Sequence, residues 1–137
     1  MYTKSLIVQE LQQVPLFEGL SKRHLGRIAS AGTVRRVAPH TRLTRRGEPG
    51  DSFYVLLEGS AEVRRPGTRS VALKRGDSFG ELALLDDAPR TATVEATGEA
   101  VVLKLSRPAF QKMLRQEPTV SIALLRNVAR MVHGNQA

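Results

Sequence analysis

Residues 79–94 hold several residue types that together could bind an anion. The segment reads Phe-Gly-Glu-Leu-Ala-Leu-Leu-Asp-Asp-Ala-Pro-Arg-Thr-Ala-Thr-Val, with a glycine and a carboxylate at the start of a helix-capable turn. Backbone N–H groups at a helix start attract anions, and Gly80 lets the backbone come close to a ligand. Arg90, fixed by Pro89 at the entry to a strand, can offer a two-pronged contact to phosphate oxygens. Glu81 would not face a phosphate but can accept a hydrogen bond from a sugar hydroxyl, so the segment predicts a sugar-phosphate site.

Both charged residues also have simpler explanations. An arginine after a proline turn is, in isolation, an ordinary surface residue. A carboxylate in the first turn of a helix favours the helix dipole by about 0.3–1 kcal/mol, which alone would account for Glu81. The ligand-binding interpretation of Arg90 and Glu81 therefore depends on the whole segment.

This segment resembles the phosphate-binding cassette of the cyclic nucleotide-binding domain family, which includes regulatory subunits of cAMP-dependent protein kinase and bacterial catabolite activator protein. The family pattern is Phe-Gly-Glu-Leu-Ala-Leu, a short variable turn and Pro-Arg-X-Ala-Thr-Val, and every fixed position is present. Supporting matches lie upstream at residues 47–51 (Gly-Glu-Pro-Gly-Asp), 57–59 (Leu-Glu-Gly) and 75–77 (Arg-Gly-Asp). The resemblance covers roughly residues 14–133, and we call residues 79–92 the cassette.

The resemblance implies a site for a cyclic nucleotide, with cAMP as the first choice and cGMP as the alternative, and no other cofactor. The residues that it assigns to the ligand are Val63, Gly80, Glu81, Leu82, Ala83, Arg90 and Thr91. Arg90 would bind the cyclic phosphate, and Glu81 would bind the ribose 2′-hydroxyl. The N–H groups near Gly80 and Ala83 would reach ribose and phosphate oxygens.

Two of these residues concern the base. Val63 has the spacing from Phe79 that is found in the kinase regulatory subunits, so it is a stronger choice than Val71 for the base wall. A role as a core valine stays open. Thr91 corresponds to a threonine of cGMP-dependent kinase that can bind the guanine amino group, but several cAMP-binding regulators and channels carry Thr or Ser there. Thr91 therefore does not decide the ligand, and a β-branched residue starting a strand explains it equally well.

Length and composition limit the possible classes of protein. The 137 residues, 41% of them apolar, suit one domain with one core, so we expect residues 1–137 to form a single domain. No run of about 18 apolar residues and no signal sequence occur, and cysteine is absent, which predicts a cytoplasmic protein without a membrane span. No catalytic motif is found, and the three histidines (His24, His40 and His133) are scattered, so neither an enzyme nor a metal site is expected.

The formal net charge of +8 favours an anionic partner. Much of the excess lies in arginine pairs at 35–36, 45–46 and 64–65. Because neighbours on a strand face opposite sides, these pairs are expected at solvated sheet edges rather than in a nucleic-acid-binding stripe. Sequence-specific DNA binding by this chain alone is therefore not expected.

The apolar periodicity and turn residues predict a mainly β fold with flanking helices. A helix pair over residues 4–31 precedes short strands, for which the expected ranges are 33–38, 42–46, 52–58, 60–65, 69–74, 92–97 and 100–105. The helical period returns over residues 107–133 after a predicted N-cap at Ser106, and Pro118 opens the last helix. Together with the resemblance, this pattern predicts an eight-stranded β-roll (a double-stranded β-helix or jelly roll) over residues 33–105, between an N-terminal helix pair and C-terminal helices.

The resemblance further implies a sensor module. Ligand capture would tighten the cassette, move Leu84 and Leu85, and swing the helices after Ser106 over the base. A ligand can drive this change only by binding the closed state more tightly than the open one. Leu82, with the two leucines above, is expected to anchor the cassette to the β-roll. Lid candidates, each of which could instead belong to the helix core or a homodimer seam, are Leu124, Leu125 and Val128.

Two other classes of function stay open. The chain could be the sensor domain of a cAMP-receptor-type transcription regulator without its DNA-binding part, since no second helical module follows Val132. It could also be a degenerate module that keeps the fold for protein contacts, although the intact Glu81 and Arg90 argue against this. The sequence identifies no effector protein or domain.

Overall fold

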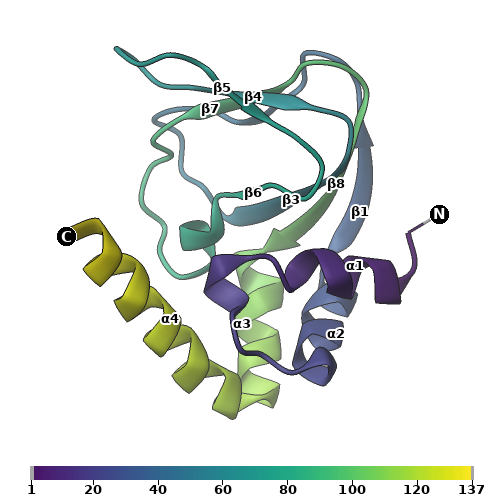
Figure 1. Cartoon of the computed structure of the whole chain (residues 1–137), viewed down its shortest axis with the longest axis vertical. Coiled ribbons are helices and arrows are strands. Elements are labelled where there is room, and N and C mark those ends of the chain that lie inside the picture. Colours follow the sequence, from purple (N-terminus) through teal and green to yellow (C-terminus); the bar gives the residue numbers. More distant parts are fainter. Residues whose placement is uncertain (1, 137) are drawn as a thin grey trace.

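The computed structural model describes residues 2–136, with side chains for residues 2–133, and contains two antiparallel sheets above a layer of helices (Figure 1). The N-terminal helices are α1 (Lys4–Leu11), the short 3-10 helix η1 (Pro15–Phe17) and α2 (Lys22–Ala31). The hydroxyls of Thr3 and Ser21 cap α1 and α2 by accepting hydrogen bonds from backbone N–H groups of the first turn.

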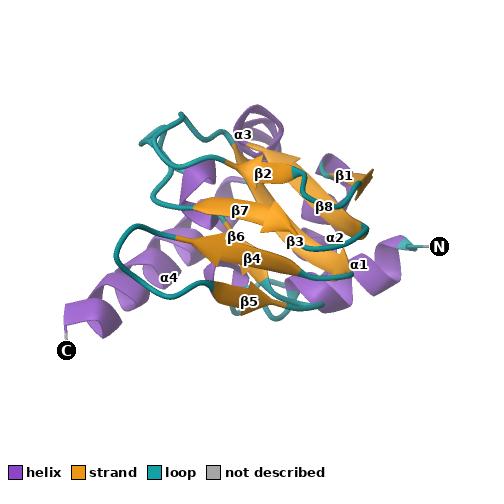
Figure 2. Cartoon of the chain, turned by 90° about the horizontal axis from the view of Figure 1, so that it is seen from above, coloured by secondary structure: helices purple, strands orange, loops and turns teal. Residues whose placement is uncertain are grey.

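Eight strands follow, and they confirm the predicted β-roll. They are β1 (Thr33–Val37), β2 (Arg42–Thr44), β3 (Ser52–Glu58), β4 (Ala61–Arg64), β5 (Val71–Leu73), β6 (Ser78–Phe79), β7 (Thr93–Ala96) and β8 (Ala100–Ser106). One sheet has the order β1-β8-β3-β6 and the other β2-β7-β4-β5, as seen from above in Figure 2. The apolar pattern did not predict β6, because two residues are too few to show an alternation.

Strand β3 is buried on both faces, which explains its nearly continuous run of apolar residues. Tyr54 and Leu56 point into the roll, where they pack with residues of β4, β6, β7 and β8. Phe53, Val55 and Leu57 point to the opposite face and pack against the helices. The molecule therefore has two apolar clusters, one inside the roll and one between the first sheet and the helices, and β3 forms the wall between them.

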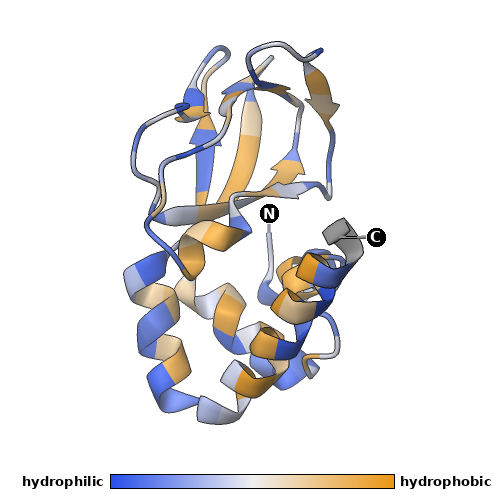
Figure 3. Ribbon diagram, turned by 90° about the vertical axis from the view of Figure 1, so that its left-hand side faces the viewer, coloured by the Kyte–Doolittle hydropathy of each residue, from blue (hydrophilic) through white to orange (hydrophobic). Residues whose placement is uncertain are grey.

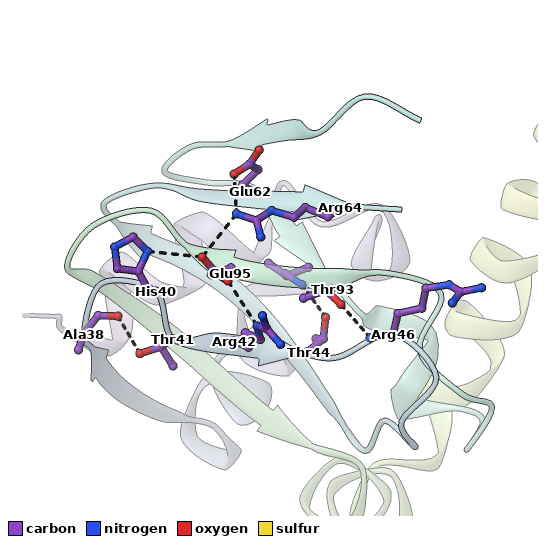
Figure 4. A network of polar contacts seen from close by, with 11 residues as sticks. Ala38, His40, Thr41, Arg42, Thr44, Arg46, Glu62, Arg64, Thr93 and Glu95 are labelled. Atoms are coloured by element: carbon purple, nitrogen blue, oxygen red, sulfur yellow. Dashed lines mark hydrogen bonds and ion pairs between the residues drawn. The ribbon is translucent and has the colours of Figure 1, made fainter. Parts of the chain in front are cut away.

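The outer face of the second sheet carries a polar network around Glu95 of β7 (Figure 4). The Glu95 side chain is only 11% exposed and pairs with His40, Arg42 and Arg64 at 3.4–3.5 Å. These basic groups compensate a carboxylate that would otherwise be costly to cover. The arginines of this sheet thus have a structural use within the protein.

The arginine pairs depart in part from the sequence prediction. Arg35 and Arg36 do lie exposed on β1, an edge strand. Arg45 and Arg46 instead follow the end of β2, and Arg65 follows the end of β4. The prediction that all three pairs lie on strands is wrong for Arg45, Arg46 and Arg65, because β2 and β4 end earlier than their sequence patterns indicated, whereas Arg64 is the last residue of β4.

The C-terminal helices are α3 (Arg107–Gln116) and α4 (Pro118–Gln136). Ser106 caps α3 through a hydrogen bond from the Ala109 N–H, as predicted. In Figure 3, hydrophobic and hydrophilic residues alternate along the helices beneath the strands. Within the part of the chain that the structure describes, no helix has the length and apolarity to cross a membrane.

Several leucines lie in places that the sequence did not indicate. Leu84 is buried and anchors the cassette, but Leu82 and Leu85 are 56% and 42% exposed, so the expected anchoring role is wrong for these two. Among the lid candidates, Leu124 is buried in the helical core and Val128 packs against it. Leu125 is 71% exposed. The cassette helix is a single 3-10 turn, η2 (Glu81–Leu84), which has too few residues to turn three leucines inward.

Candidate ligand-binding site

A cavity of about 270 Å³ lies in the cassette. Its lining residues are Gly80, Glu81, Leu82, Ala83, Asp86, Ala88, Pro89, Arg90 and Thr91. Of the residues assigned to the ligand from the sequence, all but Val63 line this cavity. Two groups of opposite charge, Glu81 and Arg90, thus face one hollow next to the backbone of η2.

Gly80 is required by two features of this turn. It precedes η2 in the left-handed conformation, with φ of 79° and ψ of 19°, which other residues rarely adopt. A Cβ atom at this position would also lie 2.5 Å from Nη1 of Arg90 and 3.1 Å from the Ser52 carbonyl oxygen. The glycine therefore sets the start of the turn and leaves room for the guanidinium beside it.

Arg90 is held between two loops. Its guanidinium donates a hydrogen bond to the Ser52 carbonyl oxygen and lies directly over Gly50, where a Cβ atom would overlap the guanidinium. Burial lowers the pKa of the Arg90 guanidinium, and the nearby Tyr54 and Asp51 oppose this shift. Even so, no ion pair joins Arg90 to a carboxylate within residues 2–133. A half-buried cation of this kind attracts an anion into the cavity.

Glu81 begins η2 and lines the cavity, and it takes part in no ion pair among the residues whose side chains are described. Because η2 spans only one turn, its dipole is small and gives a weak reason for a carboxylate there. The N–H groups of Glu81 and Leu82 stand at the start of this turn, where a helix offers no internal acceptor. By contrast, the Ala83 N–H already donates to the Gly80 carbonyl oxygen at 3.0 Å, so a ligand would have to share it.

The two residues predicted to contact a base lie apart. Val63 is buried inside the roll, opposite Val71 on β5 and Val94 on β7. It does not line the cavity, whereas Thr91 is exposed and does. The more exposed of the two predicted valines is Val71, at 52%. The structure thus assigns Val63 first of all to the core of the roll.

Arg107, at the start of α3, was not singled out from the sequence. Its Nη1 atom donates hydrogen bonds to the carbonyl oxygens of Gly50, Ala83 and Asp86, at 2.9–3.3 Å. Its backbone N–H donates to the Asp51 carbonyl oxygen. One side chain therefore joins α3, the cassette and the loop that carries Gly50. Nothing in the local sequence indicates this role, because the three acceptors are backbone groups of distant segments.

Gly50 and Ser52 were also missed as site residues. Gly50 lies in the 47–51 motif that supported the family resemblance, which was a partial signal. Ser52 contributes only its backbone carbonyl, which any residue would provide, so its type carried no signal. Among the described residues, no group of His, Asp and Glu side chains is arranged to hold a metal ion.

Comparison with known proteins places this geometry in context. The profile of the cyclic nucleotide-binding domain matches residues 34–117. The cAMP-dependent protein kinase regulatory subunit of Yarrowia lipolytica is 42% identical over 106 residues, which cover 76% of this chain and 28% of that protein. The chain therefore spans less than a third of this curated relative.

Two solved structures are similar over 93% of this chain. The N-terminal domain of a transcriptional regulator from Streptomyces coelicolor A3(2) has a TM-score of 0.83 and 32% identity, covering 93% of this chain and 92% of that one. The regulatory domain of Toxoplasma gondii PKA, co-crystallised with cAMP, has a TM-score of 0.70 and 30% identity, covering 93% of this chain and 50% of that one.

Replacing Gly50 by alanine tests whether Gly50 leaves the space in which the Arg90 guanidinium lies against the Ser52 carbonyl oxygen. We expect Gly50→Ala to push the guanidinium away from the Ser52 carbonyl and to destabilise the protein by about 1–3 kcal/mol, the usual cost of overpacking. Denaturant unfolding gives the free energy, and the NMR signal of the Arg90 Nε–H group reports the displacement.

Gly98→Ala is the matched control, since a Cβ atom there would meet no other atom within 4 Å. Its effect should stay within about 0.5 kcal/mol. An unchanged Arg90 signal in Gly50→Ala would show that the guanidinium does not pack directly over Gly50.

Proposed function

The chain belongs to the cyclic nucleotide-binding domain family, and we propose that it binds a 3′,5′-cyclic nucleotide, cAMP in the first place, in the cavity of the cassette. The observation that carries this proposal is the half-buried guanidinium of Arg90, which faces that cavity without a carboxylate partner among the described side chains. The solved relative from Toxoplasma gondii that was crystallised with cAMP supports this choice of ligand.

The parts of the nucleotide would be bound by different groups. Arg90 neutralises the cyclic phosphate together with the free N–H groups of η2, and Glu81 accepts a hydrogen bond from the ribose 2′-hydroxyl. Leu82, Ala83 and Thr91 line the rest of the cavity. The Thr91 hydroxyl is compatible with either adenine or guanine as the base. Val63 is buried inside the roll and does not line the cavity, so it would reach the base only after the roll adjusts.

We propose that the domain is a regulatory module rather than an enzyme. Ligand binding would draw the cassette inward, and Arg107 would pass this movement to α3, because its guanidinium bonds to the Ala83 and Asp86 carbonyl oxygens. Helix α4, which follows α3 after Glu117, would then move toward the base. The ligand can shift the equilibrium between the two arrangements by no more free energy than the difference between its binding free energies for them.

Two kinds of output suit such a module. The curated relatives are kinase regulatory subunits, which favours control of a protein kinase by this domain. The chain is also similar, over nearly the full length of both chains, to the N-terminal domain of a transcriptional regulator. This similarity favours control of a DNA-binding domain instead. The same cavity would serve both outputs.

We also propose that α4 forms a homodimer. Its exposed apolar residues recur at intervals of three and four: Ile122, Leu125, Ala129 and Val132. This is the spacing of a coiled-coil seam, and it lies on a different face of the helix from the buried Val120 and Leu124. A second copy of α4 would cover these side chains.

Substitution of Arg90 tests the proposed ligand directly. We expect Arg90→Lys and Arg90→Ala to weaken cAMP binding by about 30- to several-thousand-fold, because a charge pair loses one partner and lysine lacks the planar fork. Calorimetric titration gives the affinity, and Arg36→Ala, an exposed arginine on β1, is the control. Equal affinities for Arg90→Ala and the wild type would show that the site lies elsewhere.

Glu81 is tested with two ligands. Glu81→Ala should weaken cAMP binding by roughly 10- to 150-fold, the usual range for a hydrogen bond to a charged group. The loss should be much smaller for 2′-deoxy-cAMP, since the hydroxyl that donates to Glu81 is absent. If both ligands lose the same affinity in parallel titrations, Glu81 supports the turn and does not contact the ribose.

The dimer is tested by a charge in the seam. Leu125→Glu should convert a dimer into a monomer of 15.0 kDa, because a buried unpaired carboxylate opposes association. Sedimentation equilibrium measures the mass, and Arg126→Ala, on the same turn but outside the seam, should leave the dimer intact. A wild-type protein that sediments as a monomer at high concentration would refute the proposal.

A further inference from the structure

Helix α4 carries a buried amide on its core-facing side. Asn127 is 4% exposed, and its Nδ2 atom donates hydrogen bonds to the carbonyl oxygens of Leu16 at 2.8 Å and Glu18 at 2.9 Å. Both acceptors belong to η1 and the turn after it. The two N–H bonds of one side chain therefore fasten the middle of α4 to the N-terminal segment.

This amide interrupts an otherwise apolar contact. Leu124 and Val120, one and two turns earlier, are buried in the helical core. An amide among apolar side chains is costly unless it is fully hydrogen-bonded, and its bonds fit only one position of the helix. Asn127 thus fixes the position of α4 more strictly than an apolar residue of the same size would.

In the position that Asn127 fixes, α4 leaves the nucleotide cavity uncovered. All residues that line the cavity come from positions 80–91. The main contacts of α4 are with η1 and α3, and Figure 1 shows α4 running beside the helical layer, apart from the strands. The exposed Leu82 and Leu85 of the cassette are left without a cover from this helix.

The N-terminal end of α4 is held by a second set of polar contacts. Glu117, at the break between α3 and α4, is bonded to Arg23 of α2 at 2.9 Å and lies near Arg27 and His24. Asn127 lies ten residues further along, or about 15 Å at the helical rise. The helix is therefore held at a pivot and at a second point well away from it.

We propose that Asn127 is a latch that holds α4 away from the cassette and thereby lowers the affinity for the ligand. The proposal rests on the function proposed above, in which α4 moves toward the base. Movement of α4 about Glu117 must break both Asn127 hydrogen bonds. A protein whose binding-competent arrangement is only a minor fraction binds its ligand more weakly by that fraction, so opening the latch strengthens binding.

The affinity test removes the amide donors of Asn127 in two variants, of which only Asn127→Asp keeps the shape of the side chain. In Asn127→Asp a carboxylate faces the two carbonyl oxygens, and in Asn127→Ala the donors are simply lost. Both variants should bind cAMP about 5- to 30-fold more tightly than the wild type, the range that corresponds to losing one or two hydrogen bonds. Arg126→Gln, next to Asn127, exposed and matched to Asn127→Asp in charge change, should bind like the wild type.

A second measurement needs no ligand, so that a failure of the latch and a failure of the proposed function can be told apart. The chain has no cysteine, so spin labels can be placed at Asp87→Cys in the cassette and Arg130→Cys on α4, both exposed positions. Labelled protein is diluted with unlabelled protein to suppress distances between copies. Asn127→Ala should add a shorter label-to-label distance that the wild type lacks.

The outcomes separate cleanly. Tighter cAMP binding together with the new distance supports the latch. Unchanged or weaker binding by a folded Asn127→Ala, or a distance distribution identical to that of the wild type, overturns it. If the wild type binds no cyclic nucleotide at all, the proposed function fails, and the distance measurement alone then decides whether Asn127 holds α4.

Discussion

The half-buried guanidinium of Arg90 is the group on which the rest of the candidate site depends. A charge that is partly removed from water needs either a counter-ion or fixed dipoles around it. Here it has one hydrogen bond, to the Ser52 carbonyl oxygen, and glycines at positions 50 and 80 against which it lies. The guanidinium also lines the cavity of the cassette, where the proposed cyclic phosphate would supply the counter-ion. The two glycines therefore leave the space that the guanidinium occupies beside the cavity.

The same arrangement joins the cavity to the helices. Strand β3 is covered on both faces, so it forms a rigid wall behind the Ser52 carbonyl and gives Arg90 a fixed reference. The cassette itself is attached more lightly, through the buried Leu84 and the hydrogen bonds from Arg107. In the proposed mechanism, a ligand that pulled on the cassette would act on α3 through these hydrogen bonds, while β3 would stay in place.

The helical layer combines apolar packing with a few buried polar contacts that select one arrangement. Leu124 and Val120 would pack acceptably against several surfaces, since apolar contact has little direction. Glu117 and Asn127 have specific partners in α2 and η1, so they decide where α4 lies. Basic residues are used in this way elsewhere as well, as around Glu95, which explains part of the positive charge without a nucleic acid.

The features that could be predicted from the amino-acid sequence are those that are local in the chain. The cassette is contiguous, so its glycine, carboxylate and arginine could be recognised together, and helix caps and the apolar run of β3 follow from neighbouring residues. Tertiary structure alone decided which distant backbone groups meet Arg90 and Arg107, why Val63 lies in the core of the roll, and that Leu82 and Leu85 face outward. Backbone carbonyls leave no mark in a sequence, and a valine or leucine has the same pattern whether it faces a core or a cavity. The closure of the roll brings Ser52 to Arg90, across 38 positions of the chain, and so completes the seat of the cation.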